Sequence, residues 1–153
     1  MKLKVGDKAP PFKGLTTTGQ EISLSDFNGK KLVMYFYPMD DTPGCTKQAC
    51  SLRDRESEIR AKGAEILGVS TQDEKSHQKF TEKYSLNFPL LADIDGQIAK
   101  SYGAMGNGVL GLVKSLVGVA DRVTFIIDEN GLISEIIDSP STAKHAEEVL
   151  QRL

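Results

Sequence analysis

Apolar and polar residues follow two kinds of pattern along the chain. Short runs rich in branched and aromatic residues predict β-strands, and longer segments in which apolar residues recur every three or four positions predict α-helices. The run at 31–37 (KLVMYFY) is almost wholly apolar, which is typical of a buried central strand. We expect strands at 12–15, 21–24, 31–37, 65–70, 88–92, 122–128 and 132–137. We expect helices at 45–62, 73–84, 97–102 and 142–153.

Turn and capping residues mark the ends of several of these elements. Gly63 follows the first predicted helix and suits a left-handed C-terminal cap. Thr71 or Asp73 is expected to cap the start of the second helix. Asn130-Gly131, between the last two predicted strands, indicates a tight β-hairpin.

The order of these elements predicts the fold class. The first two strands form an N-terminal β-hairpin, strands and helices then alternate, and a second hairpin and a helix close the chain. This order favours an α/β fold with a central mixed sheet and helices on both faces, and the closing antiparallel hairpin suits a thioredoxin-like arrangement. Because no long linker or repeat interrupts the order, we expect residues 1–153 to form a single domain.

Length, composition and charge narrow the function classes. The 153 residues suffice for one continuous core, and 39% apolar with 26% charged residues is typical of a soluble globular protein. A formal net charge of −2 without a dominant basic patch argues against nucleic-acid binding. The start of the chain does not resemble a signal peptide, and the apolar-leaning stretch 109–120 is too short to span a bilayer. We therefore expect a cytoplasmic protein without a membrane partner.

The residues that follow the predicted central strand carry the candidate chemistry. Cys45, one of two cysteines, falls at the start of a predicted helix. Unpaired backbone N–H groups and the positive end of the helix dipole stabilise a thiolate at such a position. Thr42 lies three residues earlier, where its hydroxyl can hydrogen-bond a small oxygen-bearing substrate. Pro38 and Pro43 stiffen this loop, and Pro38 is placed to shield the thiolate from water.

The spacing of Cys45 and Cys50 makes a mechanistic prediction. Five residues along an α-helix rotate the side chain by about 500°, so the two thiols point roughly 140° apart, and their Cα atoms lie about 8–9 Å apart. A disulfide needs Cα atoms within about 7 Å. If the two cysteines do form a disulfide, the first turns of the helix must unwind.

The loop and helix start also resemble a known family. Pro38-x-x-x-Thr42-x-x-Cys45 matches the P-x-x-x-T-x-x-C pattern of the peroxiredoxins, and a second cysteine at Cys50 is similar to their bacterioferritin comigratory protein (peroxiredoxin Q) subfamily. The likeness covers nearly the whole chain. It includes the segments 6–12, 51–54, 66–70, 88–93 and 122–128.

The resemblance implies a role for each site residue. Cys45 would attack the peroxide and become a sulfenic acid, Thr42 would orient the peroxide, and Pro38 would shape the pocket. Arg122 matches the arginine of the family that stabilises the thiolate and polarises the peroxide. Cys50 would resolve the sulfenic acid to an intramolecular disulfide, which thioredoxin or a similar dithiol would reduce. The implied substrates are hydrogen peroxide and organic hydroperoxides. No cofactor is implied, and a disulfide within one chain favours a monomer.

One segment departs from the family pattern. Residues 106–121 are more apolar than expected before the arginine strand. Their apolar residues fit a helical stripe, which predicts a packed helix, a lid near the site or a contact surface. The stripe is formed by Val109, Val113, Leu116, Val117 and Ala120.

Other candidate ligands receive plainer interpretations. A structural zinc ion needs about four ligands, and the soft candidates Cys45, Cys50, His77 and His145 do not occur as two close pairs, so we expect no metal. His77 and His145 lie among charged residues and are expected to be solvated.

Two further patterns are also interpreted without a ligand. We expect Asp40-Asp41 to be a solvated pair that helps to cap the next helix. Gly106-x-Gly108-x-x-Gly111 matches the letters of the dinucleotide-binding pattern, but it follows a predicted helix instead of a strand. We interpret these glycines as part of a loop.

Two other functions compete with a peroxidase. A general thiol–disulfide oxidoreductase on the same fold would normally carry Cys-x-x-Cys at the helix start, whereas Cys45 and Cys50 are separated by four residues. A redox-responsive binding module would instead use an apolar surface, for which 109–120 is the candidate. Substitution of Cys45 separates these hypotheses, because it abolishes peroxidase turnover and leaves a pure binding function intact.

Overall fold

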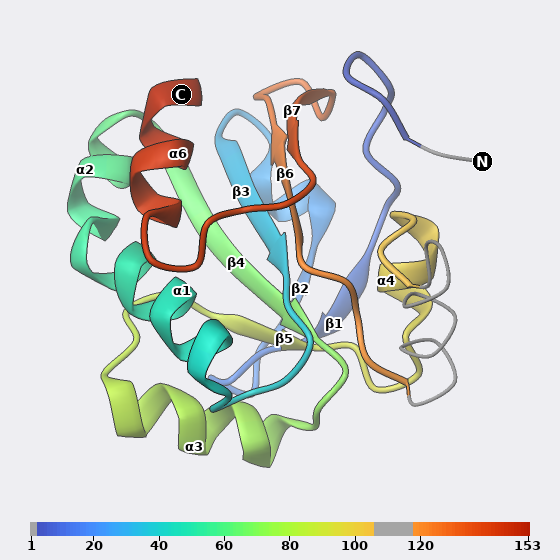
Figure 1. The fold of residues 1–153 in the computed structure, drawn as a ribbon. Coiled ribbons are helices and arrows are strands. Elements are labelled where there is room, and N and C mark those ends of the chain that lie inside the picture. Colours follow the sequence, from blue (N-terminus) through green and yellow to red (C-terminus); the bar gives the residue numbers. More distant parts are fainter. Residues whose placement is uncertain (1–2, 106–117) are drawn as a thin grey trace.

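A five-stranded mixed sheet forms the centre of the computed structural model, which describes residues 3–105 and 118–153 (Figure 1). Its strand order is β5-β4-β3-β6-β7, with β3, β4 and β5 parallel and with β6 and β7 each antiparallel to its preceding neighbour. A separate two-stranded antiparallel sheet pairs β1 with β2. The strands are β1 (Lys13–Leu15), β2 (Glu21–Ser23), β3 (Lys31–Phe36), β4 (Ala64–Ser70), β5 (Leu90–Ala92), β6 (Val123–Ile127) and β7 (Ile133–Ile137).

Helices cover both faces of the central sheet (Figure 1). Three of them, α1, α2 and α6, lie on one face, α4 lies on the other, and α3 packs beside β5. The helices are η1 (Leu24–Phe27, a 3-10 helix), α1 (Pro43–Asp54), α2 (Glu56–Ala61), α3 (Glu74–Tyr84), α4 (Gln97–Ser101) and α6 (His145–Arg152). The expected thioredoxin-like α/β architecture is confirmed.

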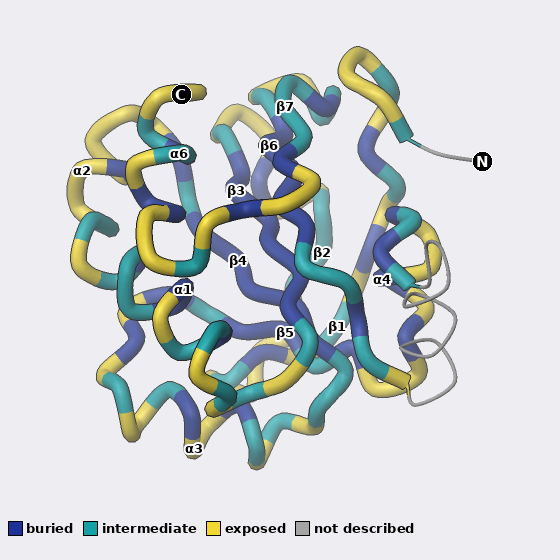
Figure 2. Tube along the Cα trace, viewed as in Figure 1, coloured by how far each residue is buried: buried dark blue, intermediate teal, exposed yellow. Residues whose placement is uncertain are grey.

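The period of two along β3 divides the core into two clusters. Val33 and Tyr35 point to the face covered by α1, α2 and α6, whereas Leu32, Met34 and Phe36 point to the opposite face. All five side chains are buried, so the prediction of a central strand at 31–37 is confirmed (Figure 2). This buried strand ends directly before the candidate site.

Several predicted boundaries match the structure. Asp73 caps α3 by accepting a hydrogen bond from the backbone N–H of Ser76 at 2.9 Å. Gly63 follows α2 with a left-handed φ of +79°. Gly131 has a φ of +80° in the turn between β6 and β7, where the Asp128 carboxylate accepts two backbone N–H bonds.

The predicted helix at 45–62 is wrong in one respect, because the structure has two helices that meet at Arg55. Arg55 has φ −116° and ψ 13°, outside regular helical geometry. The Arg53 carbonyl just before the break accepts a hydrogen bond from Asn87 Nδ2 at 3.2 Å. A long-range contact, which the local sequence does not reveal, thus competes with helical bonding.

The last helix also begins later than expected, at His145 instead of 142. Ser141 Oγ accepts a bond from the Lys144 backbone N–H, and Ser51 Oγ on α1 accepts one from the Ala146 N–H. These hydroxyls satisfy two backbone donors near the helix start, which fixes its position. Ser51 thereby also joins α1 to α6.

Part of the departure from the family pattern lies outside the described residues. The stripe residues 109–117 and the Gly106-x-Gly108-x-x-Gly111 pattern both fall there. Ala120, the last residue of the stripe, is buried in the cluster that contains Phe36. Within 3–105 and 118–153, no helix is long and apolar enough to cross a membrane.

Candidate active site

Cys45 lies in the first turn of α1, at the carboxyl end of β3. The helix begins at Pro43 with Thr42 as its N-cap, and the Thr42 carbonyl accepts the Thr46 N–H at 2.8 Å. Proline suits this first helical position because its missing N–H would have no helical partner. The Cys45 side chain is 1% exposed. Its sulfur therefore lies at the positive end of a helix, away from bulk water.

Arg122 contacts this sulfur from the position just before β6, the strand next to β3. Arg122 directly precedes β6, and its Nη2 donates to Cys45 Sγ at 3.3 Å. Its Nη1 donates to the buried Gln48 Oε1 at 2.7 Å. The bond to Gln48 orients the guanidinium, and a cation at this distance stabilises negative charge on sulfur.

Gln48 is a site residue that our sequence analysis missed. It lies three residues after Cys45 on α1, so the two side chains share one face of the helix. That spacing, together with the need of a half-buried arginine for an acceptor, is the signal that points to Gln48. Gly44 completes the arrangement, because a Cβ there would stand 3.1 Å from Arg122 Nη2.

Thr42 and Pro38 lie in the loop before Cys45, as predicted, and each has a defined contact. The Thr42 hydroxyl donates to the Met39 carbonyl at 3.1 Å. The Pro38 carbonyl accepts from Gln72 Nε2 at 3.2 Å. Both residues are half-buried, so the loop is shaped by hydrogen bonds to its own backbone and to the segment after β4.

Cys50 lies on the same helix and is half-buried. Both cysteines are free thiols, and α1 is continuous from Pro43 to Asp54. The geometric argument from the sequence therefore applies to this structure, and a disulfide between Cys45 and Cys50 requires α1 to unwind.

Tyr35 lies under the site on β3. Burial raises the pKa of its hydroxyl well above the ordinary value, and the negative charge of Cys45 raises it further. The phenol therefore stays neutral beside the sulfur. It packs in the same cluster as Cys45, which keeps water away from that side of the thiol.

The two histidines contradict our expectation, because both side chains are 0% exposed. His77 on α3 contacts Asp40 Oδ2 at 2.6 Å, and His145 on α6 contacts the Thr124 hydroxyl at 2.9 Å. Burial lowers the pKa of His145, and its hydrogen bond to Glu148 offsets part of this effect. Each histidine faces the core because a polar partner there satisfies its ring.

The expectation of a solvated Asp40-Asp41 pair is wrong for Asp40. Its carboxylate is 5% exposed and binds His77, and it does not cap α1. Asp41 is exposed and accepts from Lys83 Nζ and the Tyr84 hydroxyl, each at 2.7 Å. The hydrogen bond from Lys83 lowers the pKa of Asp41. Both carboxylates thus join the loop to α3, Asp40 through a buried contact and Asp41 through exposed ones.

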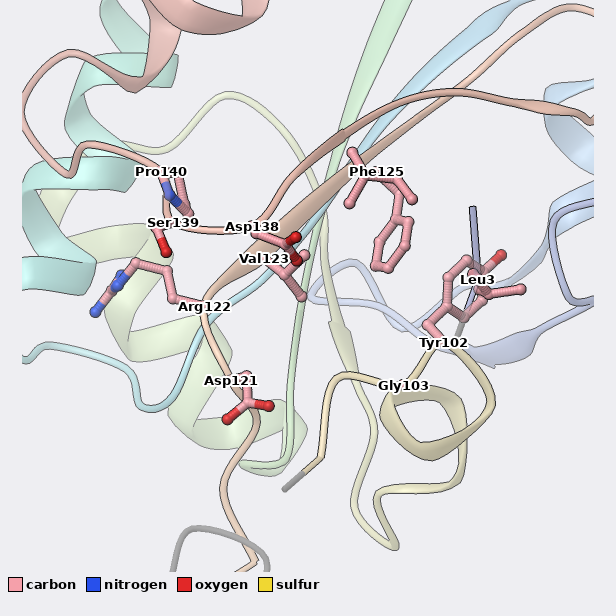
Figure 3. Close-up of a pocket in the computed structure, with 11 residues that line it drawn as sticks. Leu3, Tyr102, Gly103, Asp121, Arg122, Val123, Phe125, Asp138, Ser139 and Pro140 are labelled. Atoms are coloured by element: carbon pink, nitrogen blue, oxygen red, sulfur yellow. The ribbon is translucent and has the colours of Figure 1, made fainter. Parts of the chain in front are cut away.

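A cavity of about 440 Å³ lies beside the start of β6, where Arg122 is one of the residues that line it (Figure 3). Val123 and Phe125 line it from β6, and Asp121 and Asp138 lie beside them. The Arg122 guanidinium points away from these residues in Figure 3, and it reaches Cys45 on the other side. The cavity therefore belongs to the face of the sheet opposite Cys45. Among the described residues, no three histidine, cysteine or acidic side chains gather as a metal site.

Together, the fold and the site define a class of protein. A buried cysteine in the first turn of a helix, an arginine on its sulfur and a thioredoxin-like sheet are the features of a thiol-based redox enzyme. Comparisons with known proteins narrow this class. The model of the AhpC/TSA family matches residues 5–136.

Individual relatives agree over the full length. Peroxiredoxin Bcp of Escherichia coli is 40% identical over 151 residues, which is 99% of this chain and 96% of that protein. The crystal structure of peroxidoxin BcpB from Mycobacterium tuberculosis matches with a TM-score of 0.85 and 33% identity, covering 98% and 96% of the two chains. The bacterioferritin comigratory protein of Xanthomonas campestris, studied for its alkyl peroxide reduction activity, matches with a TM-score of 0.82 and 29% identity over 92% and 88%.

The chain belongs to the AhpC/TSA family and is a peroxiredoxin, a thiol-dependent peroxidase.

Proposed function

We propose that Cys45 is the peroxide-reactive cysteine of this peroxidase and that Cys50 resolves it. The observation that carries the proposal is the contact of Arg122 with the buried Cys45 sulfur at 3.3 Å, in the first turn of α1. Among the cysteines, Cys45 alone combines a helix N-terminus with a hydrogen-bonded guanidinium. These are the two local conditions that make a thiolate available.

In the first step, the Cys45 thiolate attacks one oxygen of the peroxide. An S–O bond forms and the O–O bond breaks, and the leaving oxygen takes a proton and departs as water or an alcohol. Charge moves from sulfur to this oxygen, and the Arg122 guanidinium, 3.3 Å from the sulfur, would stabilise it there. Thr42 and Pro38 form the loop at which the peroxide is positioned. Cys45 is left as a sulfenic acid.

In the second step, the Cys50 thiol condenses with the Cys45 sulfenic acid. The S–S bond forms and water leaves. Since α1 is continuous through both residues, the helix start must unwind before the sulfurs meet. An external dithiol, thioredoxin or a similar protein, then reduces the disulfide by exchange and restores both thiols.

The same reasoning extends to the substrates and the oligomeric state of the protein. We propose hydrogen peroxide and organic hydroperoxides as substrates, and the alkyl peroxide reduction activity of the Xanthomonas campestris relative supports the organic class. Because both reacting cysteines lie in one chain, the reaction needs no second subunit, and we propose a cytoplasmic, single-domain monomer. No cofactor takes part in these steps.

A coupled assay with thioredoxin, thioredoxin reductase and NADPH tests the proposal. The unmodified protein should consume NADPH when hydrogen peroxide or an alkyl hydroperoxide is added. Cys45→Ser should abolish turnover, and Cys50→Ser should still form a sulfenic acid once but lose thioredoxin-coupled turnover. Full turnover by Cys45→Ser would contradict the assignment of the reactive cysteine. Sedimentation of the reduced protein tests the monomer.

A further inference from the structure

The loop before Cys45 contains a buried carboxylate with three side-chain partners. Asp40 accepts from the Tyr37 hydroxyl at 2.6 Å and from the Ser76 hydroxyl at 2.7 Å, and its Oδ2 lies 2.6 Å from His77 Nδ1. Its side chain is 5% exposed, and that of His77 is 0% exposed. None of these groups takes part in the proposed peroxide chemistry. The cluster therefore needs an explanation of its own.

The hydrogen bonds of His77 show that this pair shares a proton. Nε2 lies 3.1 Å from the Leu91 carbonyl, which can only accept, so Nε2 carries a hydrogen. Nδ1 faces the Asp40 carboxyl, so a second proton lies between the two groups. The Tyr37 and Ser76 hydroxyls donate to the same carboxyl group. We interpret the contact as a buried hydrogen bond in which the Asp40 carboxyl and the His77 imidazole share one proton.

The backbone around Asp40 is fixed by the same region. The Asp40 N–H donates to Gln72 Oε1 at 3.0 Å, and the Ser70 hydroxyl donates to the Tyr37 carbonyl at 2.8 Å. Ser70 is the last residue of β4, Gln72 follows it two residues later, and His77 lies on α3. The loop that leads into α1 is therefore attached to segments outside α1, at the end of β4 and on α3.

The backbone of Asp41, the next residue, is in an energetically unfavourable conformation. Asp41 has a φ of +60°, a left-handed conformation that is unfavourable for residues other than glycine. Its exposed contacts with Lys83 and Tyr84 are of the kind that stabilise weakly. Loss of one partner from a buried hydrogen-bonded pair leaves the other polar group unsatisfied, which is more disruptive than loss of an exposed contact. The contact between Asp40 and His77 is thus a buried side-chain restraint on the loop.

We propose that Asp40, held by His77, is a positioning residue that keeps the loop before Cys45 in its peroxide-reactive conformation and limits the rate at which the start of α1 unwinds toward Cys50. The inference rests on the proposed Cys45–Cys50 disulfide. The restraint acts in opposite directions on the two steps. The restraint raises the fraction of molecules whose loop is in the peroxide-reactive conformation. It also slows the unwinding of α1 that disulfide formation requires.

Single-turnover measurements on Asp40→Asn and His77→Gln separate the two steps. Reduced protein is mixed with one equivalent of hydrogen peroxide, quenched with a sulfenic-acid trap and a thiol-alkylating reagent, and followed by mass. Because only the closed fraction reacts, we expect Cys45 oxidation to slow about tenfold, whereas conversion of the sulfenic acid to disulfide speeds up severalfold. Amide hydrogen exchange at 38–45 in the reduced protein should rise in parallel.

His145→Gln is the matched control, because it makes the same substitution at an equally buried histidine outside the loop. Glutamine at His77 retains a donor for the Leu91 carbonyl but has no group at the Nδ1 position, so it removes the Asp40 contact selectively. Ser76→Ala deletes only one donor to Asp40 and keeps the test usable if the stronger variants fold poorly. Ser76→Ala should slow Cys45 oxidation about twofold and speed up disulfide formation about twofold.

The outcomes are distinct. Opposite changes in the two rates, absent in His145→Gln, support the positioning role. For Asp40→Asn and His77→Gln, rates that stay within about twofold of the unmodified protein overturn it. For Ser76→Ala, rates equal to those of the unmodified protein overturn it. In any of the three variants, two rates that fall together, as they would for a general loss of stability, also overturn it. If Cys45 of the unmodified protein is not oxidised, or never pairs with Cys50, the proposed function fails instead.

Discussion

The Cys45 sulfur has two sources of positive potential on one side and a neutral phenol on another. The first turn of α1 and the Arg122 guanidinium stabilise the thiolate, and Tyr35 stays protonated because burial raises its pKa. Gln48 fixes the guanidinium through a 2.7 Å bond. We therefore expect the reactivity of the site to depend on the position of Arg122 as much as on its charge.

Substitution of Arg122 tests this dependence. Because Arg122→Gln removes a charged donor from the reacting atoms, we expect the rate of Cys45 oxidation to fall about 100-fold. Arg122→Lys keeps the charge but cannot reach Gln48 and Cys45 together, so its rate should fall about tenfold. Stopped-flow competition for hydrogen peroxide measures both. Arg60→Gln, at an exposed arginine of α2, is the control, and an equal effect there would refute the role of Arg122.

Gly44→Ala tests the position of the guanidinium without changing a charge. The new Cβ would stand 3.1 Å from Arg122 Nη2 and 3.6 Å from Thr142 Cγ2, so the guanidinium must shift. We expect the same kinetic measurement to show Cys45 oxidation about tenfold slower, because a preorganised donor has been displaced. Lys47→Ala, at an exposed position of α1, should leave the rate unchanged. An unchanged rate in Gly44→Ala would show that Arg122 tolerates displacement.

At this scale, motif spacing predicts Cys45, Thr42 and Pro38 as site residues, and the family pattern adds Arg122. The sequence-based interpretation was wrong for Asp40 and His77, which we expected to be solvated. Their burial arises from each other, across 37 positions of sequence. The residues next to a single polar residue in the sequence do not show whether a distant residue will pair with it in the core.

At the scale of elements, α1 is attached at both ends. Its start is joined to the loop that holds Asp40. Its later turns are joined to α6 through Ser51 and to the last residue of α3 through Arg53. The Arg53 guanidinium donates to the Tyr84 carbonyl at 2.7 Å. The attachment near Cys50 involves backbone groups of two other segments, so we expect unwinding to begin at the Cys45 end.

Ser51→Ala tests the attachment of α1 to α6. Ser51 Oγ accepts the Ala146 N–H at 3.0 Å near the start of α6, and alanine leaves that donor unsatisfied. We expect a loss of about 1 kcal/mol in the free energy of unfolding, measured by urea denaturation. Ser57→Ala, at an exposed position of α2, should change it by less than about 0.5 kcal/mol. Equal stability of the two variants would contradict the role of Ser51.

Element types were predictable because hydrophobic periodicity and turn residues act locally. The boundaries at Arg55 and His145 were not, since both depend on side chains from distant segments. Asn87 bonds the Arg53 carbonyl before the first break, and Ser51 bonds Ala146 at the second boundary. Local pattern fixes what an element is, and tertiary hydrogen bonds decide where it ends.

At the scale of the whole molecule, the sheet separates two apolar clusters, and buried polar groups lie where helices meet it. His145 joins α6 to β6 through Thr124 and remains neutral because burial lowers its pKa. The alternation of strands and helices predicted this architecture. The polar contacts between layers, which connect residues far apart in sequence, could not be predicted from it.

His145 gives stability a dependence on pH. Because its pKa is lower in the folded protein than the roughly 6.5 of an unfolded histidine, the unfolded chain takes up the proton first. Its contribution to stability is complete above about pH 6.5 and is lost as the pH falls below that value. His145→Gln should reduce the difference between urea midpoints at about pH 7.5 and about pH 5.5. Lys144→Gln should keep it, and an undiminished difference in His145→Gln would contradict this account.

The measurement that tests the account most directly is the mass of the reduced protein after one equivalent of hydrogen peroxide. The account predicts rapid loss of two hydrogens, with peptide mapping that links Cys45 to Cys50 and with faster amide exchange at the start of α1. A stable gain of one oxygen on Cys45 would keep the peroxidase but contradict the role of Cys50. No rapid change at either cysteine would contradict the central claim that Cys45 is the peroxide-reactive thiol.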